Sequence, residues 1–274
     1  MAELVAKSSS KKLVRTAESF RVMTEFSFRN YTGIPYLMGH RGALELYPEN
    51  TLISLKSAIE MGIEIIEFDV QMSRDGELII IHDDTVDRTT DGKGFVYEMT
   101  TEEIRSFDAG TKFSPSFAGE KIPILDEVLK LSASSNIALN IEIKNGPVFY
   151  ENIALKIVRK VLEFDLRDRT VISSFDHEAL YDAKKVDSKI KTAPLSVNRM
   201  HRVCDYLREL KADGFHPRWN YLTEELISEL HDNGYFVNTW IVNEESQFTK
   251  LAEWGVDAIG VNNPLKFKKL TEHD

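Results

Sequence analysis

Apolar runs and amphipathic stretches alternate along almost the whole chain, and this alternation restricts the possible folds more than any other feature. Eight short apolar runs predict β-strands near residues 36–39, 64–71, 137–143, 170–173, 192–196, 212–216, 236–240 and 258–261. Helical patterns follow at residues 51–61, 126–132, 150–164, 176–186, 199–210, 223–233 and 244–254, with a last short one after Pro264. Eight strands, each followed by a helix, predict an α/β protein with a closed (β/α)₈ TIM barrel.

The length of the chain agrees with one such barrel. The chain has 274 residues, of which 42% are hydrophobic, and a closed barrel usually needs about 250 residues. A doubly wound open sheet is the alternative, but it usually has fewer strands and often begins with a Gly-rich turn, which is absent here. We expect residues 1–34 to form an N-terminal extension, partly flexible and with a helix over 12–29, and residues 35–274 to form the barrel domain.

One segment interrupts the alternation. Residues 73–123 contain a hairpin-like DGELIIIHDD, a turn-rich TTDGKG and a short helical TTEEIRSF. This segment is too long for a simple connection from a strand to a helix. We expect it to be an inserted cap after the second strand, on the face of the barrel where active sites form.

Charge and cysteine content disfavour several classes of protein. The chain has 34 basic and 44 acidic residues, a net charge of −10, and no long basic run, so we expect no nucleic-acid partner. The single cysteine, Cys204, excludes an intrachain disulfide and is compatible with a cytoplasmic location. We expect neither a secretory signal nor a transmembrane segment, because no apolar run is long enough. The oligomeric state is left open, and a homo-oligomer is compatible with the sequence.

Three carboxylates fall in register on two consecutive predicted strands. In IEIIEFDVQ, Glu67 and Asp69 are two residues apart, so both point to the same side. In ALNIEIK, Glu142 shares a face with Asn140 and Lys144. A single acid at a strand end would simply be solvated, but three acids facing a barrel interior repel one another unless a cation lies between them. We therefore expect one divalent cation here, and oxygen donors suit Mg²⁺ or Ca²⁺ better than Zn²⁺.

Two histidines and two cationic side chains accompany the acids. His40 ends the first strand, within LMGHRGALELYPENT, and His82 follows the apolar run LIII. Imidazole exchanges protons near neutral pH, while Arg41 offers a planar fork of donors and Lys144 a point charge for a phosphate. This combination predicts phosphoryl transfer, in which one histidine activates the nucleophile and the other protonates the leaving alcohol. His216 also ends a strand and could reach the same rim.

Short motifs recur in a fixed order along residues 35–267. They are HRG at 40–42, PENT at 48–51, EFDV at 67–70, HD at 82–83, RTTDGKG at 88–94, DAGTKF at 108–113, IPILDEVL at 122–129 and NIEIK at 140–144. In this combination the chain resembles the glycerophosphodiester phosphodiesterases, although HRG or HD alone would be a weak signal. A weaker match continues through SSF, NTWIVN and GVDAIGVNNP.

The resemblance implies a metal-dependent TIM barrel with an inserted cap. Its substrates would be small glycerophosphodiesters, such as glycerophosphocholine or glycerophosphoethanolamine, and its products glycerol 3-phosphate and an alcohol. By the family pattern, His40 and His82 are the catalytic acid and base, and Glu67, Asp69 and Glu142 bind the metal. The glycerol hydroxyl is a candidate for the first nucleophile, which would give a cyclic phosphate that water then opens.

The same pattern assigns the substrate contacts. Arg41 and Lys144 face the phosphate, and Trp240 lines the mouth of the site. Near the last strand the family commonly has Thr-Asp, one residue and then Pro, whereas this chain has Val261-Asn262 before Asn263-Pro264. The asparagine keeps the capacity for hydrogen bonds but loses the charge, which affects the fit of the substrate. We expect Asn50, in PENT, to cap the first helix.

Three alternatives remain. The first is a related phosphodiesterase acting on lipids, such as a lysophospholipase D or a sphingomyelinase-D-like enzyme, which would use the same acids and histidines. The second is a catalytically silent barrel that binds a phosphate ligand. The third is an unrelated metal-dependent barrel enzyme acting on enolates, with Lys144 as the base.

Overall fold

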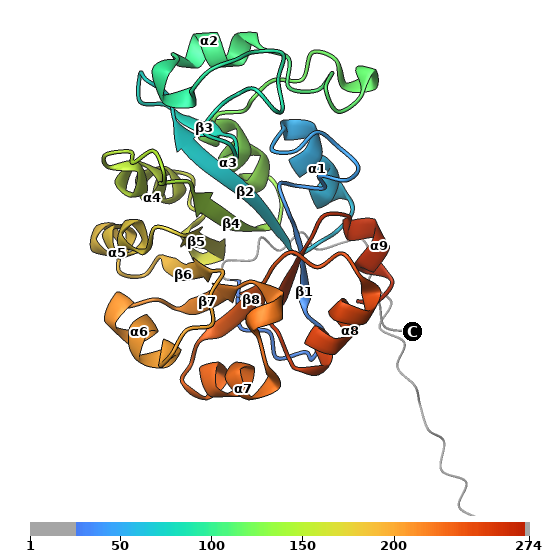
Figure 1. Ribbon diagram of the computed structural model, residues 1–274, viewed down its shortest axis with the longest axis vertical. Helices are drawn as coiled ribbons and strands as arrows, with labels where there is room; N and C mark the ends of the chain where they lie inside the picture. The colour runs from blue at the N-terminus through green and yellow to red at the C-terminus, as the bar shows by residue number, and fades with distance from the viewer. Residues whose placement is uncertain (1–25, 272–274) are drawn as a thin grey trace, which may run out of the picture.

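The computed structural model describes residues 26–271, and within them eight parallel strands close into a barrel (Figure 1). The barrel strands are β1 (Tyr36–Gly39), β2 (Ile65–Met72), β4 (Ala138–Ile143), β5 (Thr170–Ser174), β6 (Lys191–Ser196), β7 (Gly214–Pro217), β8 (Phe236–Thr239) and β9 (Ala258–Val261). Strand β1 pairs with both β2 and β9, which closes the sheet on itself. The predicted TIM barrel is therefore confirmed, and the open-sheet alternative is wrong.

Helices between the strands cover the outside of the barrel. They are α1 (Leu52–Glu60), α3 (Leu125–Ala133), α4 (Ile153–Glu163), α5 (His177–Val186), α6 (Val203–Leu210), α7 (Glu224–Asp232), α8 (Glu245–Glu253) and α9 (Pro264–Lys268). The predicted cap of the first helix is wrong by one residue, because Thr51 and not Asn50 accepts the hydrogen bond from the Ser54 amide. Among residues 26–271, no helix combines the length and apolarity that a membrane span needs.

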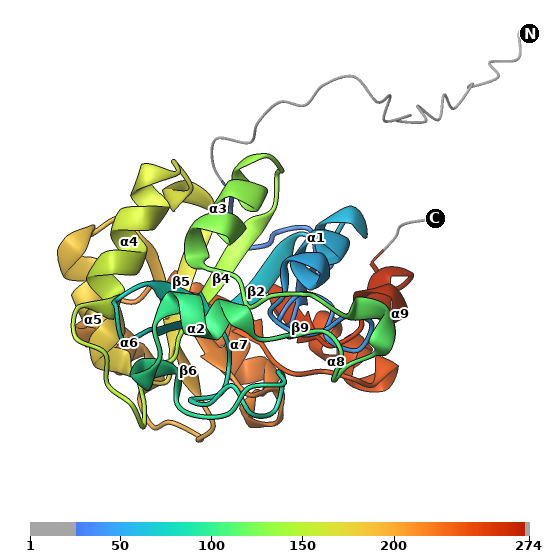
Figure 2. The same ribbon diagram turned by 90° about the horizontal axis from the view of Figure 1, so that it is seen from above.

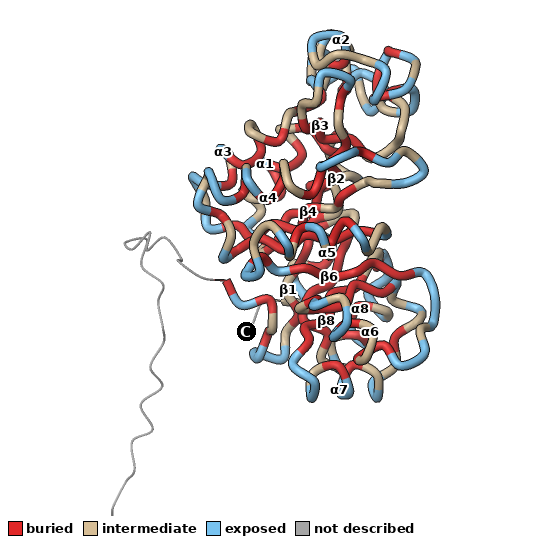
Figure 3. Tube along the Cα trace, turned by 90° about the vertical axis from the view of Figure 1, so that its left-hand side faces the viewer, coloured by how far each residue is buried: buried red, intermediate tan, exposed pale blue. Residues whose placement is uncertain are grey.

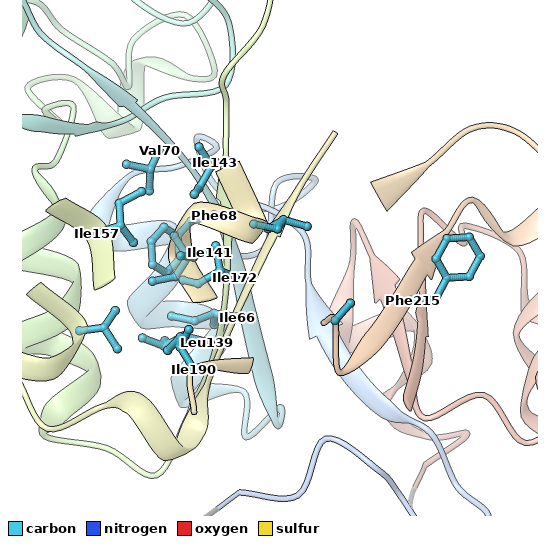
Figure 4. Packing of buried hydrophobic residues seen from close by; sticks show 14 of the residues in the cluster. Ile66, Phe68, Val70, Leu139, Ile141, Ile143, Ile157, Ile172, Ile190 and Phe215 are labelled. Atoms are coloured by element: carbon cyan, nitrogen blue, oxygen red, sulfur yellow. The ribbon is translucent and has the colours of Figure 1, made fainter. Parts of the chain in front are cut away.

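Strand alternation separates an outer and an inner layer of side chains. The outward residues of β2 and β4 are buried against the helices, as Figure 4 shows for Ile66, Phe68, Val70, Leu139, Ile141 and Ile143. Residues at the alternate positions point into the barrel, where a smaller apolar cluster includes Ile65 and Ala138 near the starts of these two strands. The acids of β2 and β4 follow on the same inner face, farther along the strands.

The amino-terminal end of the barrel is filled by aromatic rings. Phe26 and Phe28 pack with Tyr36 and Phe236, with ring centroids 5.0–5.4 Å apart. Most of the helix predicted over 12–29 lies outside the described residues, and the part that is described, residues 26–29, is not helical.

The segment between β2 and α3 contains β3 (Leu78–Ile80), η1 (Val96–Glu98), α2 (Thr101–Ser106) and η2 (Pro115–Phe117). Strand β3 pairs antiparallel with β2, which agrees with the predicted hairpin. A small hydrophobic cluster of its own, which includes Ile104 and Val86, supports the segment. The segment lies at the end of the molecule opposite α7 (Figures 1 and 3). In the view from that end, its helix α2 is in front of β2 (Figure 2). Its role as a cap over the active site stays a prediction.

Candidate active site

The three predicted carboxylates lie together at the inner face of β2 and β4. Asp69 is in register with Glu142 across the two strands, and Glu67 is two residues before Asp69 on the same face. Each side chain offers one oxygen, and these atoms lie within 4.8 Å of one another. Side chains alternate between the two faces of a strand, so these three carboxylates lie on the same face and close together.

The carboxylates have an environment that suits a cation. Burial raises the pKa of Glu67 well above its ordinary value, and the charges of Asp69 and Glu142 raise it further. Among the described residues, buried Glu67 Oε1 accepts no hydrogen bond, and buried Asp69 Oδ1 accepts none either but pairs with the Lys144 ammonium at 3.3 Å. Buried oxygens with unused lone pairs and excess negative charge are what a hard divalent cation requires, so the residues present fit such an ion.

Arg41 contacts the acids from the loop after β1. Its backbone amide donates a hydrogen bond to Glu67 Oε2 at 2.8 Å, and its Nε atom lies 3.4 Å from Asp69 Oδ2. Its Nη1 atom donates to Glu49 Oε1 at 2.7 Å. Asn50, from the same loop, donates to Asp69 Oδ2 at 2.8 Å. The first loop therefore orients both the guanidinium and the acidic cluster.

Lys144 approaches from the end of β4. Its Nζ atom lies 2.6 Å from Glu142 Oε1 and 3.3 Å from Asp69 Oδ1. Burial opposes the charged ammonium, but the two carboxylates outweigh burial and raise the pKa of Lys144 above its ordinary value. The lysine is therefore protonated at neutral pH and adds a positive charge beside the cluster.

The two histidines differ in their partners. His40 Nδ1 lies 2.8 Å from Asn262 Oδ1, and burial, aided by the charge of Arg41, lowers the pKa of His40 to about 4. His82 Nδ1 lies 2.6 Å from Asp83 Oδ1. Burial also lowers the pKa of His82, and its carboxylate neighbours oppose that shift. One imidazole therefore has a neutral amide as its partner and the other has a carboxylate.

One cavity of about 260 Å³ connects most of these groups. Seven of the eight predicted site residues line it, namely His40, Arg41, Glu67, His82, Glu142, Lys144 and Trp240. The eighth, Asp69, is only 1% exposed and forms ion pairs with Arg41 and Lys144, which do line the cavity. Trp240 is held by a hydrogen bond from its Nε1 atom to the His216 carbonyl oxygen at 2.8 Å and by an edge contact with Phe175.

A wider cavity of about 590 Å³ adjoins the first one. The two share His82, Glu142, Lys144 and Phe175. The wider cavity adds the ring of Phe149, which is 75% exposed, and the carboxylates of Asp83, Asp84 and Asp176. A group bound at the carboxylate cluster therefore has room for a substituent in an acidic, aromatic surrounding.

The structure corrects one candidate and adds others. His216 is fully buried and lines neither of these two cavities, so the expectation that it reaches the rim is wrong. Glu49, Asn50 and Asp83 contact the site residues, although sequence reasoning gave them no role there. Their motifs, PENT and HD, were the available signal, but a motif does not say which partner each side chain binds.

Comparison with known proteins gives a consistent result. The glycerophosphoryl diester phosphodiesterase family matches residues 40–266. A glycerophosphodiester phosphodiesterase of Caldanaerobacter subterraneus subsp. tengcongensis is 39% identical, over 83% of this chain and 94% of that protein.

Solved structures agree in fold. A crystal structure of a glycerophosphoryl diester phosphodiesterase from Silicibacter pomeroyi has a TM-score of 0.82 at 27% identity, covering 89% of this chain and 95% of the other. An Oleispira antarctica phosphodiesterase, solved with the product sn-glycerol-3-phosphate, has a TM-score of 0.78 at 30% identity, covering 87% and 97%. By its sequence and its fold, the chain belongs to the glycerophosphoryl diester phosphodiesterase family.

Proposed function

We propose that this protein hydrolyses glycerophosphodiesters to glycerol 3-phosphate and an alcohol, with a divalent cation and two histidines. The observation that carries the proposal is the single cavity that brings together His40, His82, Arg41 and Lys144 with the carboxylate cluster. The family and the product-bound relative support the same chemistry.

Glu67, Asp69 and Glu142 would hold the cation, Mg²⁺ or Ca²⁺ by the hardness of the donors. When bound, the cation supplies positive charge to the non-bridging oxygens of the phosphate. Arg41 and Lys144 add donors on the same cavity wall. The phosphodiester thus enters a local positive field although the chain as a whole carries a net charge of −10.

We assign His40 as the base. With Asn262 Oδ1 accepting the Nδ1 proton, the Nε2 atom of His40 carries the free lone pair. Burial keeps this ring neutral at physiological pH. His40 removes the proton from the nucleophile, which is the glycerol hydroxyl of the substrate or a water molecule, and the new oxygen–phosphorus bond forms.

We assign His82 as the acid. Asp83 accepts the Nδ1 proton of His82 and opposes the lowering of the His82 pKa by burial, so Nε2 can deliver a proton to the leaving alcohol oxygen as its bond to phosphorus breaks. The wider cavity begins at His82 and would receive the alcohol. A cyclic phosphate, if formed, would be opened by water with the roles of the two histidines exchanged.

The test is an activity panel with added metal. The protein is assayed with glycerophosphocholine and glycerophosphoethanolamine in Mg²⁺, in Ca²⁺ and in EDTA, and glycerol 3-phosphate is measured. We expect turnover to require the metal. We expect His40→Ala and His82→Ala each to reduce turnover at least 100-fold. Turnover unaffected by EDTA would contradict the cation, and no turnover of any diester would favour the silent barrel.

Two further substrates test the lipid phosphodiesterase and the enolate enzyme. Faster turnover of lysophosphatidylcholine than of glycerophosphocholine would favour a lipid phosphodiesterase. Turnover of a carboxylate substrate, without any phosphodiester hydrolysis, would favour the enolate chemistry. The cytoplasmic location expected from the composition stays a prediction.

A further inference from the structure

Arg88, in the segment between β2 and α3, binds two carboxylates at once. Its Nε and Nη2 atoms donate hydrogen bonds to the two oxygens of Asp83 at 2.7 and 3.0 Å. Its Nη1 and Nη2 atoms donate to the two oxygens of Glu49 at 2.7 and 2.8 Å. One guanidinium thus makes two bidentate contacts, a geometry that fixes orientation as well as distance.

Each of these carboxylates also holds a side chain of the active site. Asp83 Oδ1 lies 2.6 Å from His82 Nδ1, and Glu49 Oε1 accepts from Arg41 Nη1 at 2.7 Å. The hydrogen bonds from Arg88 are the largest cause that lowers the pKa of Asp83, to about 2, so that carboxylate stays charged. Hydrogen bonds and ion pairs therefore connect His82 to Arg41 through Asp83, Arg88 and Glu49.

This arrangement can act on both the stability of the fold and the geometry of the site. The Arg88 side chain is 47% exposed, where a single ion pair contributes little to folding because water and salt screen it, although a bidentate network contributes more. Arg88 lines neither the 260 Å³ nor the 590 Å³ cavity, so it does not reach a substrate bound there. Through Asp83 and Glu49 it is connected to two side chains that do line the cavity, His82 and Arg41.

We propose that Arg88 is a positioning residue that couples His82 to Arg41. By holding Asp83 and Glu49 in one rigid unit, it sets the direction of the imidazole that protonates the leaving alcohol and of the guanidinium that faces the phosphate. The inference rests on the proposed function, because those two roles belong to it. It also joins the segment between β2 and α3, which already contributes His82 to the site, to the loop after β1.

The first test is Arg88→Ala in the full chain. We expect kcat/KM for glycerophosphocholine to fall about 10- to 100-fold, mostly in kcat, as is usual when the partner of a catalytic group is lost. Arg88→Lys keeps the charge but cannot contact both carboxylates in parallel, so it should recover only part of the activity. Added guanidinium should partly rescue Arg88→Ala and leave the wild type unchanged.

Arg105 provides a matched control in the same segment. Its two Nη atoms contact the two oxygens of Glu127 at 2.5 and 2.9 Å, and it lines neither cavity. Arg105→Ala therefore removes one bidentate contact of the same kind without affecting the contacts that lead to His82. We expect its kcat/KM to stay within about twofold of the wild type. Equal losses in Arg88→Ala and Arg105→Ala would overturn the proposal, and so would full activity in Arg88→Ala.

A second readout does not need turnover. The ring resonances of His82 in the NMR spectrum should move in Arg88→Ala and stay in place in Arg105→Ala, because only the first variant releases Asp83. Unchanged His82 resonances in Arg88→Ala would contradict the proposal that Arg88 positions His82, even if the enzyme is active. If the wild type hydrolyses no diester, the proposed function fails, while this spectrum still decides whether Arg88 positions His82.

Discussion

His40 Nδ1 and Asn262 Oδ1 lie 2.8 Å apart and join the carboxyl ends of β1 and β9. The family resemblance of the sequence implies an aspartate at the position of Asn262. A neutral amide orients the imidazole but has no negative charge to stabilise the protonated ring. Burial therefore lowers the pKa of His40 to about 4. Burial therefore leaves His40 deprotonated at neutral pH, and Asn262 orients its ring.

Asn262→Asp tests that relationship. The added carboxylate favours protonated His40 and raises its pKa, so a higher pH is needed to obtain the neutral base. We expect the acid limb of the pH profile of kcat/KM to move upward by about 1 unit or more. Asn263→Asp adds the same charge one residue along, where the side chain caps α9, and should move the limb less. An unmoved limb in Asn262→Asp would mean that His40 is not the base.

Much of the site could be predicted from the sequence because strand alternation is strict. Once residues 64–71 and 137–143 are identified as strands, a period of two puts Glu67, Asp69 and Glu142 on the face opposite Phe68 and Ile141. The barrel then requires adjacent parallel strands to present those faces to one interior. No knowledge of loops is needed for this step.

Contacts made by loops could not be predicted in this way. Arg88 meets Glu49 across 39 positions of sequence, and that meeting depends on how an irregular segment folds back. Thr51 caps the first helix instead of Asn50 because Asn50 has a left-handed backbone, with φ of +57°, and turns its side chain to Asp69. Asparagine is on average the better N-cap of the two, so this tertiary contact overrides the local capping preference.

Metal binding should stabilise the fold. Mg²⁺ or Ca²⁺ at about 100 times its Kd would add roughly 2.7 kcal/mol to the free energy of unfolding, because it binds the folded chain and not the unfolded one. Glu67→Gln removes one ligand and should abolish most of that gain in thermal unfolding. Since Glu67 has a raised pKa, protons compete with the metal, and the metal affinity should fall as the pH drops. Identical melting with metal and with EDTA would contradict a cation at this cluster.

We expect the wider cavity to favour a cationic alcohol. Phe149 and Phe175 are 75% and 48% exposed there, beside the carboxylates of Asp84 and Asp176. Aromatic faces and carboxylates attract ammonium groups, and one exposed cation–π contact contributes about 0.5–1 kcal/mol. We expect glycerophosphocholine to have a lower KM than glycerophosphoglycerol, and Phe149→Ala to raise the first KM about two- to fivefold while leaving the second unchanged. Equal effects on both substrates would show that the ring does not sense the charge.

Gly42, next to Arg41, should tolerate no side chain. Its φ is +88°, and an added Cβ would lie 2.4 Å from Ser54 Oγ and 2.7 Å from the backbone carbon of Ser54. Gly119 has a similar φ of +93° but no atom within 4 Å of that position, so Gly119→Ala measures backbone strain alone. In urea unfolding, Gly42→Ala should lose about 1–3 kcal/mol more than Gly119→Ala, the usual cost of overpacking. Activity should fall only in Gly42→Ala, because relief of the clash displaces the adjacent Arg41. Equal losses of stability in the two variants would show that the loop rearranges to accommodate the added Cβ at no extra cost.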